Sequence, residues 1–158
     1  MSVLSFFTLC ENSPLGEAIR ASNWLFPVIE SFHLLGLAVI GGAVLILDLR
    51  LLGLGLTRQP TDRIWRDTRP WLLSSLTVMI LSGLLLFTSE ATKLYYHEAF
   101  WVKMISLLLS IIFTFTIARR TALADPKRVS PLWRRVVALV SIVLWSGVGM
   151  GGRWIGFS

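Results

Sequence analysis

Four long, almost uninterrupted apolar stretches constrain the fold of this chain more than any other feature of its sequence. A helix needs about 20 consecutive apolar residues to cross a hydrocarbon layer about 30 Å thick. Only 15% of the residues are charged, whereas soluble domains carry about a quarter. The sequence therefore predicts an all-α integral membrane four-helix bundle, a single domain over residues 1–158, with transmembrane helices at about 24–47, 71–89, 100–118 and 136–157.

The distribution of basic residues predicts the orientation of these helices. Eleven of the 15 Lys and Arg residues fall in the two connections that follow the first and third apolar stretches. Because basic loops stay on the cytoplasmic side of a membrane, we expect both termini to be periplasmic, in a bacterial inner (cytoplasmic) membrane. The net charge of +6 then reflects membrane topology, and we expect no nucleic-acid partner.

The segment before the first apolar stretch is predicted to lie at the periplasmic surface. Ser13 and Pro14 are typical of a helix start, and Leu15, Ala18 and Ile19 give that helix a short apolar face. We therefore expect a short interfacial helix that leads into the first transmembrane helix.

Two ionisable residues interrupt the first apolar stretch. Glu30 and His33 are three positions apart and so share one face of a helix. Ionisable groups within a membrane span usually face the bundle interior or a cavity. The His33 ring can hydrogen-bond across helices, relay protons or ligate a haem iron. We interpret His33 as an axial haem ligand, Glu30 as the carrier of a coupled proton, and Gly36 as a gap for a bulky group.

The third apolar stretch carries one polar stripe. Its members recur at spacings of three, four and four residues, which places them on one face of a helix: Lys103, Ser106, Ser110 and Thr114. Lipid offers hydroxyl groups no partner, so we expect the stripe to face the bundle. Lys103 would then be the second haem ligand; the alternative is that its side chain snorkels to the headgroups.

Further residues would surround a haem in the periplasmic half of the bundle. Gly147 and Gly151 either let a flat macrocycle lie against the backbone or serve close helix packing. Arg20 and Arg153 would bind either the haem propionates or lipid headgroups. His97 is either a solvent-exposed loop residue or the second ligand in place of Lys103.

One charged pair near the end of the first stretch is interpreted as structural. Asp48 and Arg50 are expected to pair locally and to anchor the helix end at the cytoplasmic face.

Several segments resemble a widespread family of bacterial four-helix membrane proteins of unknown function. They are PLGEAIRASNWLFP at 14–27, ESFHLLG at 30–36, DLRLLG at 48–53 and GRWI at 152–155. A more distant resemblance is to the membrane haem-containing protoporphyrinogen oxidases, carried by a histidine early in the first span and by WVK at 101–103. That resemblance implies that His33 and Lys103 serve a haem site. The copper-resistance D proteins are similar in helical-bundle character.

Together these features favour an inner-membrane b-type haem-binding protein. It would transfer electrons between a membrane quinone or a porphyrin and a partner at the outer face; whether it is itself a haem-dependent oxidoreductase stays open. One alternative is a copper or small-solute transporter that uses Glu30, His33 and the methionines Met104 and Met150. Another is a non-catalytic subunit of a larger membrane complex, or a homo-oligomer.

Overall fold

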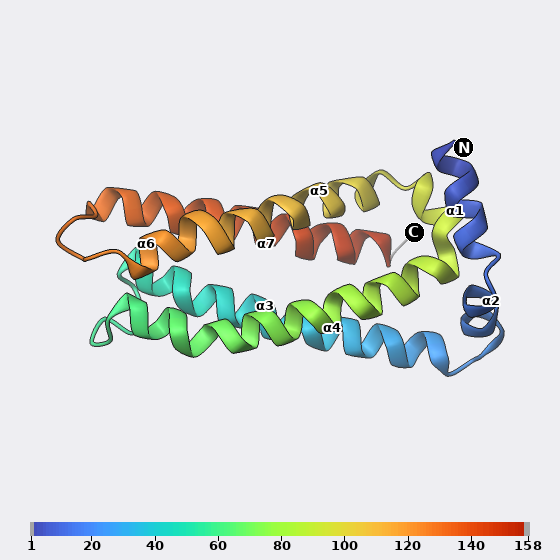
Figure 1. Cartoon of the computed structure of the whole chain (residues 1–158), viewed down its shortest axis with the longest axis horizontal. Helices are drawn as coiled ribbons and strands as arrows, with labels where there is room; N and C mark the ends of the chain where they lie inside the picture. Colours follow the sequence, from blue (N-terminus) through green and yellow to red (C-terminus); the bar gives the residue numbers. More distant parts are fainter. Residues whose placement is uncertain (1, 157–158) are drawn as a thin grey trace.

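The structure is a computed structural model that describes residues 2–156, and it consists of helices joined by short loops (Figure 1). In chain order the elements are α1 (Val3–Glu11), α2 (Pro14–Ala21), α3 (Leu25–Leu52), α4 (Thr61–Tyr95), α5 (Glu98–Phe113), the π-helix η1 (Thr114–Ala118), α6 (Arg119–Leu123) and α7 (Pro131–Ile155). The long helices run side by side, and α1 and α2 lie at one end of them.

Four helical rods are long and apolar enough to cross a membrane. They are α3, α4, the continuous rod α5–η1–α6 and α7, with 28, 35, 26 and 25 residues. At 1.5 Å per residue even the shortest rod is about 38 Å long, which exceeds a hydrocarbon layer of about 30 Å. The predicted all-α four-helix bundle is therefore confirmed, and its composition indicates a multi-pass membrane protein.

The helices extend past the predicted transmembrane segments. The first ends at Leu52 instead of 47, the third ends at Leu123 instead of 118, and the fourth begins at Pro131 instead of 136. Backbone hydrogen bonding continues through charged residues at a membrane surface, since their long side chains reach water. The predicted end of the fourth helix at residue 157 lies outside the described residues.

The predicted start of the second transmembrane helix, at residue 71, is wrong. Helix α4 begins at Thr61, directly after its N-cap Pro60, and continues through Pro70. A proline inside a helix removes a backbone hydrogen bond and costs about 3 kcal/mol. Here buried side chains on both sides of Pro70 hold the helix in place, with Trp65 3% and Leu72 1% exposed.

The four rods form two helical hairpins, α3 with α4 and α5 with α7. The hairpins meet mainly through α3 and α7, whereas α5 makes little contact with α3 or α4. Glycines permit close packing within each hairpin, because a Cβ on Gly36 would lie 3.0 Å from Met79 Cγ and one on Gly147 would lie 2.8 Å from Ser106 Oγ. The close approaches at Gly36 and Gly147 agree with a role in helix packing.

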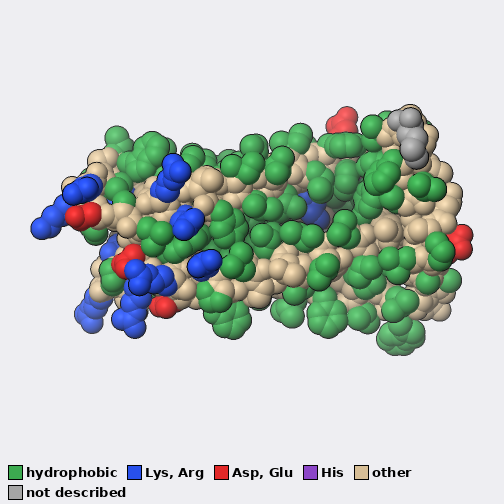
Figure 2. All heavy atoms as spheres, viewed as in Figure 1, with side chains coloured by type: hydrophobic (Ala, Val, Ile, Leu, Met, Phe, Trp, Pro, Cys, Tyr) green, Lys and Arg blue, Asp and Glu red, His purple; other side chains and the backbone are tan. Residues whose placement is uncertain are grey.

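The two ends of the bundle differ in charge. Blue Lys and Arg side chains gather at the end formed by loops 53–60 and 124–130, which we name the basic end (Figure 2). The opposite end, with α1, α2 and the described end of α7, is the terminal end. Hydrophobic side chains cover most of the surface drawn between them. Leu81, Leu108 and Val143 are 59%, 60% and 69% exposed, as lipid contact requires.

The helix predicted to start at Ser13 and Pro14 is confirmed as α2, and an unpredicted helix, α1, precedes it. Phe7 of α1 is only 6% exposed. Its ring lies among those of Phe87, Tyr95, Phe100 and Trp101, with centroid distances of 4.9, 5.3, 6.2 and 6.1 Å. A nine-residue helix is unstable alone, so α1 depends on this packing, which the sequence does not reveal.

Replacement of Gly16 by alanine should destabilise the terminal end. A Cβ at Gly16 would overlap the Thr88 carbonyl oxygen and lie 2.7 Å from the Glu11 carbonyl oxygen. Because backbone atoms cannot move aside easily, we expect Gly16→Ala to cost about 1–3 kcal/mol, measured as a lower melting temperature in detergent. Gly41→Ala is the matched control, since nothing lies within 4 Å of a Cβ there. Equal melting temperatures for the two variants would contradict this account.

Candidate functional site

His33, predicted to face the bundle interior, is half-buried in α3 and contacts α4. Its Nδ1 lies 2.9 Å from Ser82 Oγ, and the Ser82 hydroxyl donates to the Val78 carbonyl at 2.6 Å. A hydroxyl has a single hydrogen, so the Nδ1–H of His33 must be the donor to Ser82. The lone pair of the neutral ring is therefore on Nε2.

Lys103 of α5 lies on the Nε2 side of this ring. Its Nζ is 3.5 Å from His33 Nε2, at the outer limit of a hydrogen bond. Lys103 is half-buried, and its amine lies next to the His33 ring. Further along the same stripe Ser110 is 0% and Thr114 2% exposed. The prediction that the stripe faces the bundle is confirmed.

Glycines, which have no side chain, lie beside both members of the His33–Lys103 pair. A Cβ on Gly83 of α4 would lie 3.2 Å from His33 Cε1, and one on Gly152 of α7 would lie 3.4 Å from Lys103 Nζ. A Cβ on Gly151 would lie 3.0 Å from Lys103 Cβ. All four rods therefore contribute to the site: α3 and α5 through side chains, α4 through Ser82 and Gly83, and α7 through glycines.

Three other predicted site residues occupy different positions on their helices. Glu30 is exposed, so the expectation that it faces the interior together with His33 is wrong; three residues turn a helix by about 300°, enough to separate the two side chains. Arg153 is exposed on α7. His97 is the N-cap of α5, six residues and so about 9 Å along the helix from Lys103.

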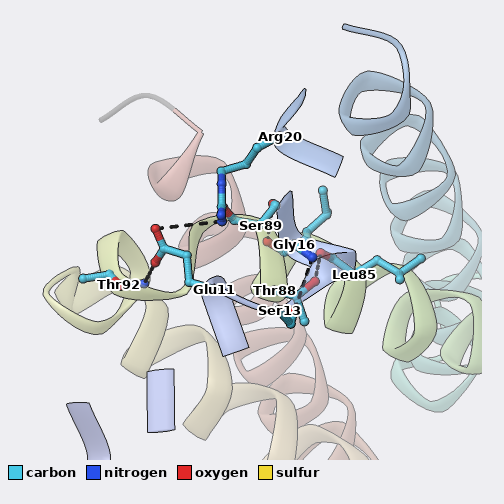
Figure 3. A network of polar contacts seen from close by, with 9 residues as sticks. Glu11, Ser13, Gly16, Arg20, Leu85, Thr88, Ser89 and Thr92 are labelled. Carbon is cyan, nitrogen blue, oxygen red and sulfur yellow. Dashed lines mark hydrogen bonds and ion pairs between the residues drawn. The ribbon is translucent and has the colours of Figure 1, made fainter. Parts of the chain in front are cut away.

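Arg20 does not point to the His33–Lys103 pair but binds at a break in α4 (Figure 3). Glu90 has non-helical backbone angles, φ −137° and ψ 33°. Arg20 Nη1 donates to the Ser89 carbonyl at 3.0 Å, and Glu11 accepts from the Thr92 backbone N–H at 2.5 Å. The two N-terminal helices thus supply partners for backbone groups at the break, a requirement in a membrane.

The carboxylate of Glu11 is stabilised in its charged form. The Thr92 hydroxyl and the Thr92 backbone N–H hold the pKa of Glu11 below its usual value of 4.5, with a further contribution from the charge of Arg20. Arg20 Nη1 lies 4.0 Å from the second carboxylate oxygen. This hydrogen-bonded set joins α1 and α2 to α4.

The predicted pair of Asp48 and Arg50 is absent. Arg50 Nε donates to the Gln59 carbonyl at 2.7 Å, across the loop that follows α3. Asp48 is instead 0% exposed inside the bundle. Two residues turn a helix by about 200°, so these side chains leave it on opposite faces.

Ser82 and Gly83 were not predicted as site residues. Ser75, Ser82 and Ser89 recur every seven residues and are 4%, 6% and 1% exposed. Seven residues make two helical turns, so this spacing marks the face of α4 that turns inward and could have identified Ser82 from sequence.

The arrangement offers two nitrogen donors on opposing helices and no protein-only metal cage. Among residues 2–156 no three His, Cys, Asp or Glu side chains come together. A metal held here would therefore need further ligands from a cofactor. Without a metal, the pair can hydrogen-bond to a polar or anionic group of a membrane-soluble molecule.

Comparison with known proteins gives one result. A family model described as "Family of unknown function (DUF6644)" matches residues 6–158. No curated protein and no solved structure matches the chain. The predicted resemblance to a family of unknown function agrees with this result, and the distant resemblances to haem-containing protoporphyrinogen oxidases and copper-resistance D proteins are not shown by it.

The Glu11 contacts should make stability depend on pH. A depressed pKa contributes stability above the pKa of the unfolded chain, and that stability is lost as the pH falls through the folded pKa. At pH 7 we expect Glu11→Gln to lower the unfolding free energy by about 1 kcal/mol, since charge-assisted hydrogen bonds are stronger than neutral ones. The difference from wild type should shrink below about pH 4.5 in thermal unfolding series. A difference that does not vary with pH would contradict the assignment.

Proposed function

Because the chain belongs to this family of unknown function, its activity has to be inferred from its own side chains, and we propose that it is a b-type haem-binding electron-transfer protein of the bacterial inner membrane. The observation that supports this proposal is a contact inside an apolar bundle: Lys103 Nζ lies 3.5 Å from His33 Nε2, the ring nitrogen that has the lone pair. In this proposal His33 is the first axial ligand and Lys103 the second.

The hydrogen bonding of His33 suits a metal ligand. Ligating histidines usually donate their second ring N–H to a fixed acceptor, which sets the tautomer and orients the ring. The contact of His33 Nδ1 with Ser82 Oγ at 2.9 Å meets this condition. Since Ser82 is itself held by the Val78 carbonyl, rotation of the ring would break its hydrogen bond to a fixed acceptor.

The two nitrogens lie close enough to hold one group together. They are 3.5 Å apart, and the flexible stem of Lys103 lets its amine adjust to a bound group. Lys103 would have to be deprotonated to ligate a metal, because an ammonium group has no lone pair.

Helix packing supports access for a flat macrocycle at this site. The third rod is the least buried of the four, with 17% of its most apolar window inside the protein, and α5 makes little contact with α3 or α4. Gly83 and Gly152 add no side chain next to the two ligands. A macrocycle entering between α5 and the α3–α4 hairpin would displace few contacts.

A bound haem would supply one-electron exchange, and the chain's own residues would bind and orient it. His33 and Lys103 hold the iron, Ser82 fixes the ring of His33, and the apolar rods exclude water. Arg20 is already bound to Ser89 and Glu11, so it is not assigned to the propionates. Glu30 is exposed, and no proton step is assigned to it.

We also propose an orientation of the chain in the membrane. If the basic end is cytoplasmic, the terminal end is periplasmic, and the site lies in the periplasmic half of the bundle. Electrons would then pass between a quinone or porphyrin dissolved in the lipid and a partner at the periplasmic face.

An optical spectrum of the purified protein tests the proposal. Protein from haem-replete cells should show a haem Soret band, and His33→Ala should lose at least about tenfold in bound haem, since the first axial ligand is removed. Lys103→Ala should keep haem but change its coordination spectrum. Glu30→Gln is the matched control and should keep the wild-type spectrum.

Two results would refute this function. One is a colourless wild-type protein that also fails to take up added haem. The other is a His33→Ala variant with unchanged haem content. Colourless protein that co-purifies with a stoichiometric membrane partner would instead favour the non-catalytic subunit.

A further inference from the structure

A second ionisable group lies deep in the bundle, in the half nearer the basic end. Asp48 of α3 is 0% exposed, four residues and about 6 Å from the end of its helix at Leu52. Neither of its carboxyl oxygens has a hydrogen-bond partner. The buried Ser141 hydroxyl of α7 is its polar neighbour.

Among residues 2–156, no basic side chain forms an ion pair with Asp48. Arg50 is turned to the Gln59 carbonyl. On the surrounding helices Arg66 pairs with Asp62, and Arg63 pairs with Asp67 on the exposed side of α4. Arg134 donates to the Pro126 carbonyl. The other basic residues toward the basic end are exposed: Arg58, Arg69, Arg119, Arg120, Lys127, Arg128 and Arg135.

An isolated carboxylate in such a place is costly. Burial of an unpaired, non-hydrogen-bonded charge costs far more than burial of the neutral acid, which holds its proton instead. Even the neutral acid leaves polar oxygens unsatisfied, at about 1–3 kcal/mol. Ionisable residues kept inside membrane spans at such a cost usually serve ion or proton movement.

The surroundings exclude most cations as the ligand. Ca²⁺ takes six to eight oxygen ligands and Mg²⁺ six. In the part of the chain that the structure describes, Asp48 has Ser141 as a polar neighbour and belongs to no group of three or more His, Cys, Asp or Glu side chains. A proton needs one oxygen lone pair and nothing more.

We propose that Asp48 is a proton-binding site whose carboxyl group exchanges a proton with the solution at the basic end of the bundle. On binding, an O–H bond forms at one carboxylate oxygen. On release that bond breaks and a water molecule accepts a proton, either directly or through the Ser141 hydroxyl, which takes the proton from Asp48 as it passes its own hydrogen to the water. The site lies about one helical turn from the end of α3, so the path to water is short. This inference does not depend on the haem proposal.

Carbodiimide labelling tests the site. Dicyclohexylcarbodiimide reacts with protonated carboxyl groups in apolar surroundings, and the labelled residue can be located by peptide mass spectrometry of the full chain in detergent. We expect labelling of Asp48 that slows as the pH is raised between about 4 and 9, because the deprotonated form does not react. Asp48→Asn should lose this label and keep the wild-type melting temperature, whereas Glu30→Gln, which removes an exposed acid of the same helix, should keep it.

Three outcomes would overturn the inference. The first is no label on Asp48 at any pH while other carboxyl groups react. The second is labelling that does not change with pH, which indicates a permanently protonated structural acid. The third is protection by Na⁺ at constant pH, which indicates a cation site. The label is located in the wild-type chain, so a variant that fails to fold does not change the result. The test can also be read in protein that contains no haem, so it is independent of the haem proposal.

Discussion

The absence of water inside a bilayer governs this structure. Hydrogen-bonding groups in the membrane interior need partners from the protein itself, because lipid tails offer none. Most polar side chains in the rods follow this requirement by bonding to their own helix, as Ser110 does to the Ser106 carbonyl and Ser82 to the Val78 carbonyl. Trp145 donates to Thr114 between helices. Polar and ionisable side chains that do not bond to their own helix are therefore candidates for a function.

Two sites of this kind lie at different depths in the bundle. His33 and Lys103 meet between the two hairpins toward the terminal end, and Asp48 lies alone toward the basic end. Helix α3 carries both His33 and Asp48, which are 15 residues and so about 22 Å apart along the helix axis. A protein that moves electrons at one end and protons at the other needs no direct contact between the two groups. Each can therefore be tested without the other.

The architecture could be predicted from sequence alone, because it depends on the composition of long stretches of the chain. Four apolar runs fix four rods, and hydroxyl spacing along 103–114 correctly predicted which face of the third rod turns inward. The sequence did not predict α1, which depends on ring contacts between Phe7 and residues about 80 to 95 positions away in the sequence. Pro70 was misleading for a similar reason, since packing on both sides outweighs the local cost of a proline.

The site was predicted less completely than the fold. Helical spacing placed Glu30 with His33, but an angular separation near 60° left one side chain on the surface and the other inside. Arg20 is occupied at the break in α4, and a break at Glu90 has no proline or glycine to signal it. Which nitrogen of His33 is free depends on Ser82, 49 positions away, and such partners emerge only when the helices are packed.

The boundary between the α3–α4 hairpin and the α5–α7 hairpin, which we call the seam, has a consequence for assembly. Because α5 barely touches α3 and α4, each hairpin can insert as its own unit, and the groups of the His33–Lys103 pair come from different units. A molecule that binds both groups joins the units, so its binding free energy adds to the cohesion of the whole bundle by mass action. A molecule bound in the seam would therefore strengthen the association of the two hairpins.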